Sequence, residues 1–280
     1  MEYHAERYVD FSLLIFNNNQ LVALLPANRD GSTLYSHGWL TFGGMMYNTQ
    51  MKAALMLDIF KHLFLYLQSN GIHTFLYKAI PFIYHNKPAQ EDLYALFRNN
   101  AKLYRRDISS TIDLKRRIKF SKRKIKSIKN AFKIEGITIK KTNTFGLFWE
   151  ILSEILENKY NKQPVHSLRE IQMLESRFPN NIKLFSVGID DEIIGGTVIF
   201  ENKGVAHTQY IAGNENCRKI GGLDALFSYL LTEYYSEYNY FDFGISTERD
   251  GLYLNEGLIN FKERFDAHAV VHDFYRLGIV

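Results

Sequence analysis

The chain has 280 residues, 46% of them hydrophobic and 5 of them proline, and a formal net charge of +4. This length and composition are typical of one large or two medium globular domains and argue against a disordered chain. A single cysteine, Cys217, excludes an internal disulfide and a zinc site made of cysteine pairs. The single cysteine also favours the cytoplasm, and no metal is expected. Because no apolar run reaches about 18 residues, we expect no membrane span.

The first part of the sequence alternates strand patterns with helical ones. Residues 1–8 look like the end of a helix, so the chain is expected to begin with a shortened amino terminus. The remaining expected elements are a hairpin over 11–26, a helix over 49–70, a strand over 73–80, a helix over 90–97 and a strand over 102–114. This interleaving indicates an α/β or α+β domain with a central sheet.

A glycine-rich loop separates the hairpin from the first long helix, and it contains Ser36 and His37. Glycine permits close approach of a backbone to a ligand, so these two polar side chains are candidates for substrate contacts. Tight turns around a buried core would explain the same glycines.

The positive charge is concentrated in the segment 115–141, which has twelve basic residues and one acid. This segment carries +11, and the other residues together carry −7 because the whole chain carries +4. Apolar residues recur near helical spacing among the cations, so a basic amphipathic helix is expected that ends near Gly136. This helix could bind the phosphate backbone of a nucleic acid such as tRNA, bind an anionic membrane surface, bind an acidic substrate or be a solvated face.

Two helices, over 144–160 and 167–178, come next, and His166 stands just ahead of the second one. Ser167 is explained as a helix N-cap, whereas His166 is a lone histidine that could face a ligand or the core. Three antiparallel strands are then expected over 182–189, 193–201 and 205–212.

The third of these strands is expected to border a cleft, because it carries polar residues in an otherwise apolar run. Strict alternation places His207 and Gln209 on one face of this strand and Thr208 and Tyr210 on the other.

The stretch that follows has the pattern of an anion site. Apolar residues at helical spacing predict a helix over 223–234, with Gly221 and Gly222 at its start and Arg218 and Lys219 just before them. Unencumbered backbone N–H groups and cations at a helix amino end attract a phosphate or pyrophosphate. A plain junction with two solvated cations is the alternative. A strand over 240–243, a helix over 255–264 and a strand over 267–275 complete the chain.

Four segments carry a resemblance to a known family: Gly195-Gly196, the run from 207 to 222, Tyr-Phe-Asp-Phe-Gly at 240–244, and Asn-Glu-Gly-Leu-Ile-Asn-Phe-Lys at 255–262. They are similar to the FemAB-like (FemXAB) branch of the GNAT acyltransferase superfamily, and the closing segment is the most specific. The resemblance implies an α+β fold of two tandem GNAT-like domains, at 1–117 and 118–280, each a mostly antiparallel mixed sheet flanked by helices.

The resemblance also implies roles for individual residues. The Phe-Lys pair of this group lies near the transferring groups, so Phe261 and Lys262 are expected to be catalytic, with Lys262 stabilising negative charge, and His207 is a further catalytic candidate. A surface lysine is the alternative for Lys262. The expected donor-binding residues are Thr197, Val198, Arg218, Lys219, Gly221 and Gly222. The expected acceptor-binding residues are Ser36, His37, His166, Gln209, Tyr210 and Asn255.

Three functions are consistent with these residues. The first is an N-acyltransferase that moves an acyl group from acyl-CoA to a small-molecule amine of a cell-envelope precursor or a nucleotide-linked sugar. The second is an aminoacyl-tRNA-dependent ligase that builds a peptide bridge, for which the +11 segment at 115–141 is the motivation. The second glycine at 221–222 also stands one residue earlier than in the acyl-CoA motif. The third is a non-catalytic tandem GNAT scaffold.

Overall fold

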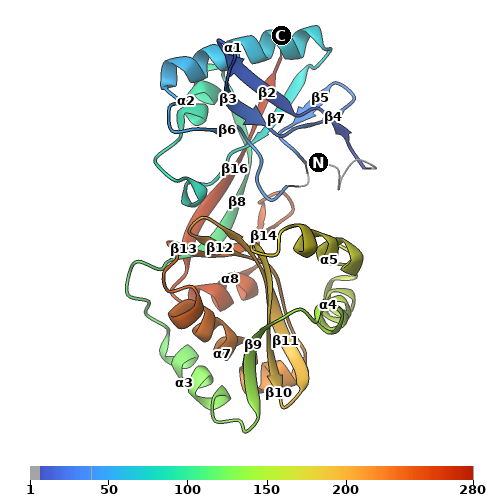
Figure 1. Cartoon of the computed structure of the whole chain (residues 1–280), viewed down its shortest axis with the longest axis vertical. Helices are drawn as coiled ribbons and strands as arrows, with labels where there is room; N and C mark the ends of the chain where they lie inside the picture. The colour runs from blue at the N-terminus through green and yellow to red at the C-terminus, as the bar shows by residue number, and fades with distance from the viewer. Residues whose placement is uncertain (1–6, 39, 280) are drawn as a thin grey trace. The chain divides into compact units, whose positions relative to one another are not determined.

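The computed structural model describes residues 7–38 and 40–279, and the chain divides into two compact units (Figure 1). Unit 1 comprises Met1–Ile108, Thr247–Tyr253 and Val270–Val280, and unit 2 comprises Ser109–Ser246 and Leu254–Ala269. Two late segments therefore group with the first unit, and the domain division at 117/118 stays a prediction. The helix end expected at the start of the chain falls mainly on residues 1–6, outside the described part.

The strands of unit 1 form part of a large sheet, in the order β1-β4-β5-β7-β16-β8, and a small sheet in the order β2-β3-β6. β5 and β7 are parallel, whereas β7 and β16 are antiparallel. The bounds are β1 (Val9–Asp10), β2 (Leu13–Asn17), β3 (Gln20–Leu25), β4 (Asn28–Asp30), β5 (Thr33–Tyr35), β6 (Met46–Tyr47), β7 (Thr74–Lys78), β8 (Lys102–Asp113) and β16 (His268–Gly278). β8 and β16 contribute 102–108 and 270–278 to this unit.

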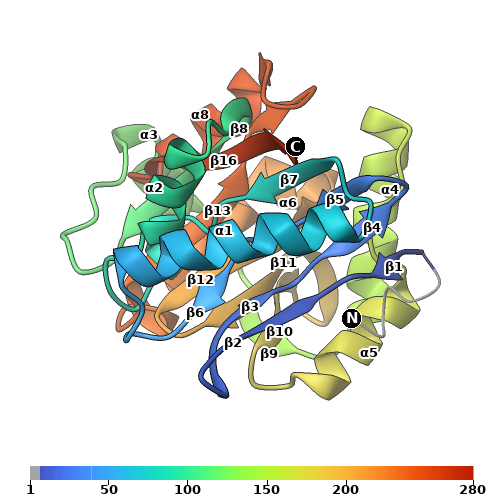
Figure 2. The same cartoon turned by 90° about the horizontal axis from the view of Figure 1, so that it is seen from above.

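Helix α1 (Ala53–Ser69) closes the core of unit 1 and lies over its strands (Figure 2). Its buried side chains recur at helical spacing and pack against strand residues such as Leu34 and Phe75. The helix stops before Gly71, whose φ of +70° is readily adopted by glycine, as the sequence predicts. The 3-10 helix η2 (Phe82–Tyr84) and α2 (Glu91–Arg98) complete the helices described in unit 1, and β14 (Thr247–Glu248) pairs with β15 (Tyr253–Leu254) in a two-stranded ribbon.

The sheet of unit 2 has the order β8-β13-β12-β11-β10-β9. Its further strands are β9 (Ile137–Thr142), β10 (Ile182–Ile189), β11 (Glu192–Asn202), β12 (Val205–Gly213) and β13 (Tyr240–Ile245). Neighbouring strands are antiparallel except for β12 and β13, which are parallel. The α+β class with mostly antiparallel sheets flanked by helices, predicted from the sequence, is confirmed.

Helices cover both faces of this sheet, with α3 and α7 on one face and α4 and α5 on the other (Figure 1). The bounds are α3 (Lys122–Ala131), α4 (Phe145–Tyr160), α5 (Leu168–Arg177), α6 (Glu215–Ile220), α7 (Gly222–Tyr229), the π-helix η3 (Leu230–Tyr234) and α8 (Glu256–Glu263). None of the helices in the described part of the chain has both the length and the apolar character needed to cross a membrane.

The segment just before α7, which contains Arg218 and Lys219, is itself helical. Asn214 caps α6 by accepting a hydrogen bond from the Cys217 N–H, and Gly221 ends the helix with a left-handed φ of +76°. Arg218 and Lys219 therefore lie in the last turn of α6, where cations favour the helix dipole. The asparagine cap and the left-handed glycine thus enclose a short helix that the sequence analysis does not predict.

Candidate functional site

The parallel strands β12 and β13 of unit 2 pair along only part of their length and form a fork. Val205, Ala206 and His207 lie opposite Tyr240, Phe241 and Asp242, and no further pairs join the two strands. Beyond this point β12 continues to Gly213, while β13 pairs with β8 on its other side. Beyond His207, β12 therefore has no strand partner on its β13 side within the described residues.

A β-bulge in β12 lies just beyond the fork. Thr208 pairs with Ile199 and Tyr210 pairs with Val198, so Gln209 is an extra residue in β12. The strict alternation expected through His207 and Gln209 is wrong here, because a bulge interrupts the two-residue period of side-chain direction.

A buried carboxylate, Asp242, organises the polar groups at the fork. Asp242 is fully buried. Its Oδ2 lies 2.8 Å from His207 Nδ1, and its Oδ1 accepts hydrogen bonds from the hydroxyls of Ser109 (2.5 Å) and Thr111 (3.0 Å) and from the Gly244 N–H (3.2 Å). A carboxylate facing Nδ1 favours the His207 tautomer that carries its hydrogen on Nδ1 and its lone pair on Nε2.

Lys262 lies on α8, contacts the end of β13 and is 2% exposed. Its Nζ donates to the carbonyl oxygens of Gly244 and Ile245, each at 2.8 Å, and to the Ser246 hydroxyl at 2.9 Å. Burial lowers the pKa of Lys262 to about 8, and the nearby carboxylate of Asp242 opposes this shift. The surface-lysine alternative is therefore excluded. Because an ammonium group has three hydrogens, these bonds use all of them. Lys262 holds the last two residues of β13 and Ser246 after them, and its role in stabilising substrate charge stays a prediction.

The neighbouring catalytic candidate, Phe261, packs in an aromatic cluster. Its ring centroid lies 6.1 Å from that of Phe227 and 5.4 Å from that of Phe265, and Lys124 Nζ lies 4.4 Å from its centroid. Asn255 is the N-cap of α8, since its side chain accepts a hydrogen bond from the Leu258 N–H at 3.0 Å. Both residues thus have structural contacts, and their substrate roles stay predictions.

His166 and Tyr210 are brought together on the α4–α5 side of the sheet. The Tyr210 oxygen lies 2.5 Å from His166 Nδ1 and accepts from the His166 N–H at 3.1 Å, and Trp149 Nε1 donates to the His166 carbonyl oxygen at 3.3 Å. The Tyr210 and Trp149 rings pack edge to face with centroids 5.1 Å apart. These contacts fix the loop between α4 and α5.

The predicted donor residues lie in packed surroundings. Thr197 and Val198 are fully buried in β11, which pairs on both sides, and Thr197 Oγ1 donates to the Tyr210 carbonyl oxygen at 2.8 Å. The strand that diverges is therefore not β11 but β12, which leaves β13 after His207. Lys219 forms an exposed ion pair with Glu215 at 2.9 Å.

The amino end of α7 is covered by α3. A Cβ atom added at Gly221 would contact the Ser127 hydroxyl oxygen, and one added at Gly222 would lie 2.8 Å from Cys217 Sγ. Asp224 in the first turn of α7 forms an ion pair of 2.6 Å with Lys124, which is 4% exposed. These glycines allow close packing of α3 and α7, and anion binding at this point stays a prediction.

This packing role can be measured by unfolding in urea. Gly221→Ala is expected to destabilise the protein by about 2 kcal/mol, because alanine disfavours a left-handed φ and its methyl group would displace Ser127. Gly146→Ala is the matched control, because Gly146 lies inside α4 with no atom within 4 Å of an added Cβ, and it should stabilise by about 0.5–1 kcal/mol. A Gly221→Ala protein as stable as wild type would contradict the packing role.

Unit 1 contains a second parallel fork, between β5 and β7. The pairing ends at Tyr35 and Leu76, and the next residue, Ser36, bridges the two strands. The Ser36 N–H donates to the Leu76 carbonyl oxygen at 2.8 Å, and its hydroxyl accepts from the Lys78 N–H at 2.7 Å. Ser36 and His37 are both buried, so this fork is filled by the chain itself. Their substrate roles stay predictions.

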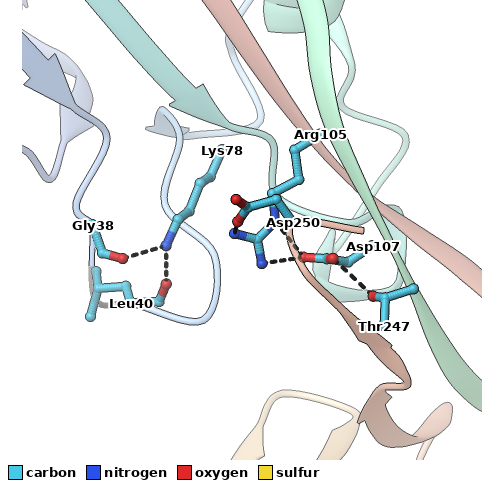
Figure 3. Close-up of polar contacts among 7 residues, drawn as sticks. All are labelled: Gly38, Leu40, Lys78, Arg105, Asp107, Thr247 and Asp250. Carbon is cyan, nitrogen blue, oxygen red and sulfur yellow. Dashed lines mark hydrogen bonds and ion pairs between the residues drawn. The ribbon is translucent and has the colours of Figure 1, made fainter. Parts of the chain in front are cut away.

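Lys78 anchors the glycine-rich loop beside this second fork (Figure 3). Its Nζ donates to the carbonyl oxygens of Gly38 (2.8 Å) and Leu40 (2.7 Å), and burial lowers its pKa to about 8. Figure 3 also shows Arg105 between Asp107 and Asp250, at 2.8 and 2.7 Å. This cluster balances positive with negative charge, which is typical of a structural network.

An apolar groove of about 760 Å³ lies between the β2–β3 hairpin and α1 in unit 1. Leu14, Phe16 and Tyr66 line it together with the polar side chains of Asp58 and His62. Within the described residues no group of three or more His, Cys, Asp or Glu side chains could hold a metal ion.

Sequence reasoning found His207 and Lys262 but missed Asp242, Ser109 and Thr111. Asp242 has one sequence signal, since it is an acid between aromatic residues in a buried strand. Ser109 and Thr111 lie far from it in the sequence and give no such signal.

The fold of the whole chain is that of tandem GNAT-like proteins of the FemAB-like type, as the sequence resemblance predicts. FemX has a TM-score of 0.66 at 10% identity, with 97% of this chain and 89% of that chain covered. L-PGS from Bacillus licheniformis has a TM-score of 0.65 at 16% identity, with 95% and 83% covered. A tandem GNAT protein from the clavulanic acid biosynthesis pathway has a TM-score of 0.53 at 10% identity, with 96% and 82% covered. No family model and no curated protein matches the chain.

Proposed function

We propose that this protein transfers an acyl or aminoacyl group to an amine, with the chemistry at the fork of β12 and β13. The observation that carries the proposal is the His207–Asp242 pair, because a buried carboxylate that orients a histidine is an arrangement suited to proton transfer. The fold supports the same class, since its neighbours include proteins named FemX and a tandem GNAT protein.

In the proposed reaction the amine nitrogen attacks the carbonyl carbon of a thioester or ester. The C–N bond forms, the carbonyl π electrons move to oxygen, and collapse of this intermediate breaks the bond to the thiolate or alkoxide leaving group. The amine proton passes to His207 Nε2 and then to the leaving group, while Asp242 stabilises the protonated ring.

The fork itself supports binding of the donor. Backbone groups of β12 beyond His207 face no partner from β13, so they are placed to hydrogen-bond an extended acyl carrier. Thr208 Oγ1 is buried and has no hydrogen-bond partner among the described residues. A ligand hydroxyl or amide would satisfy it, since buried polar atoms are rarely left unpaired.

For the donor we propose acyl-CoA first, with an amine of a cell-envelope precursor or a nucleotide-linked sugar as acceptor. The closed amino end of α7 is a specific observation in favour of the second candidate, aminoacyl-tRNA, because it offers no open cradle for the pyrophosphate of coenzyme A. A neighbour named as a putative lysylphosphatidylglycerol synthetase, with a TM-score of 0.63 at 12% identity, supports an aminoacyl donor as well.

The test is a transfer assay on the full chain. The protein is incubated with acetyl-CoA, with longer acyl-CoAs or with charged tRNA, each with glucosamine as the amine probe, and mass spectrometry follows donor consumption. We expect donor cleavage that depends on the protein, with the acyl-CoA or the tRNA arm identifying the donor. If no donor is bound in calorimetry or consumed, the transferase proposal is wrong and the scaffold alternative replaces it.

A further inference from the structure

Helix α3 of unit 2 carries a straight stripe of lysines on its outer face. Lys122, Lys126 and Lys129 are exposed along the helix, and Lys133 is exposed in the turn that follows. Their spacing of four, three and four residues places them on one side. The opposite side, with Lys124, Ile128 and Ala131, is buried.

These four cations have no acidic partners. No ion pair joins any of them to a carboxylate in the described part of the chain. By contrast, the buried Lys124 on the inner face has Asp224 as its partner. The stripe is therefore a row of uncompensated positive charges, and its field attracts a surface with regularly spaced negative charges.

Apolar side chains border the stripe. Ile125 is 41% exposed and Phe132 is 50% exposed, and their separation of seven residues places both along the same edge of α3. Ile134, in the following turn, is 36% exposed. Contact with a phosphate backbone does not lower the free energy of such side chains, whereas their burial in the apolar boundary of a lipid layer does.

The residue types in the stripe also bear on whether its partner is a nucleic acid or a layer of anionic lipid. Recognition of nucleic acid favours arginine forks and stacked aromatic rings, whereas lysines act as point charges on long apolar stems. A row of lysines beside isoleucine and phenylalanine fits a plane of lipid phosphates better than a grooved duplex.

We propose that α3 docks on a membrane surface that contains anionic phospholipid, through Lys122, Lys126, Lys129 and Lys133 with Ile125 and Phe132. This docking does not depend on the transferase proposal, because neither the His207–Asp242 pair nor Lys262 takes part in it. Each lysine near an anionic surface strengthens binding about fivefold.

Vesicle sedimentation with the full chain tests the charged part. Wild type is expected to bind phosphatidylglycerol–phosphatidylcholine vesicles and not pure phosphatidylcholine, and added salt should weaken the binding. Lys126→Gln/Lys129→Gln should weaken it about 25-fold. Lys52→Gln/Lys61→Gln makes the same charge change at exposed residues of unit 1 and should leave binding unchanged. Equal binding by the two double variants would overturn the proposal.

The apolar part distinguishes lipid from RNA. Ile125→Ser/Phe132→Ser is expected to weaken vesicle binding about tenfold without a change in charge. Leu65→Ser/Phe97→Ser is the matched control, because both side chains are exposed on helices of unit 1, at 58% and 75%. The membrane proposal is wrong if the protein does not bind anionic vesicles but binds unfractionated tRNA, and if Ile125→Ser/Phe132→Ser does not change its affinity for tRNA. The stripe would then be an RNA site.

Discussion

His207→Gln is expected to lower the rate constant of acyl transfer about 10²–10⁴-fold, because it removes the group that accepts the amine proton. Glutamine can still donate to the Asp242 carboxylate from a similar position, so folding should be retained. The rate is measured in single turnovers with the donor that the transfer assay identifies, and stability is measured by thermal unfolding.

Asp242→Asn tests whether the pair acts as a unit. An amide in place of the carboxylate still accepts at one oxygen, but it no longer stabilises a protonated His207 ring. The double variant should therefore lose little more activity than the more damaging single one, because groups of one catalytic unit are not additive. Additive losses would contradict the paired role.

The matched control for this pair is His268, a surface histidine whose Nε2 lies 3.9 Å from Asp266 and whose side chain is 84% exposed. His268→Gln should leave the rate unchanged. If His207→Gln also leaves the rate unchanged in a folded protein, His207 is not the base and the proposed mechanism is wrong.

Lys262→Met is expected to destabilise the protein by about 2–4 kcal/mol at pH 7, because it leaves the buried carbonyl oxygens of Gly244 and Ile245 without their donor. Methionine fills a similar volume, so the loss reports the hydrogen bonds and not a cavity. Transfer activity should fall as well, since the end of β13 that Lys262 binds forms one side of the fork.

The change of the free energy of unfolding with pH differs between a buried lysine and an exposed lysine. Burial places the pKa of Lys262 at about 8 in the folded protein, below its ordinary value of 10.5. Between these values the unfolded chain binds more protons, so wild-type stability rises with pH, by up to about 3 kcal/mol from this group. Lys262→Met should lose this contribution, whereas the exposed Lys61→Met should keep it; the contribution of Lys78, whose pKa is also lowered to about 8, remains in both variants. Urea unfolding at pH 7, 8, 9 and 10 measures the difference, and parallel curves for wild type and Lys262→Met would contradict it.

Local patterns predicted most of the elements, because periodicity and end signals act within a few residues. The three strands after α5 and the basic helix lie close to their expected ranges, and Ser167 caps α5 as expected, with Glu170 completing a capping box. The short helix α6 was missed because Asn214 and Gly221 are also typical of turns.

The site was less predictable because it depends on contacts between distant segments. Ser109 and Asp242 are 133 residues apart in sequence and form a 2.5 Å hydrogen bond. The bulge at Gln209 reverses which side chains of β12 point to each face of the sheet. No glycine or proline at this position indicates the bulge in the sequence. At the glycine pair 221–222 the sequence is consistent with an anion site or with a plain junction, and the contact with α3, which is distant in sequence, could not be predicted.

The last strand of the chain, β16, lies between β7 and β8 in the sheet of unit 1. A ribosome makes the first 108 residues of this unit early, but the strand that joins β7 to β8 is made only after unit 2. Unit 1 therefore completes its sheet only after all of unit 2 has been made, and until then the facing edges of β7 and β8 are unpaired. The nascent chain is most exposed to aggregation during this interval, which would make chaperone protection most valuable at that stage.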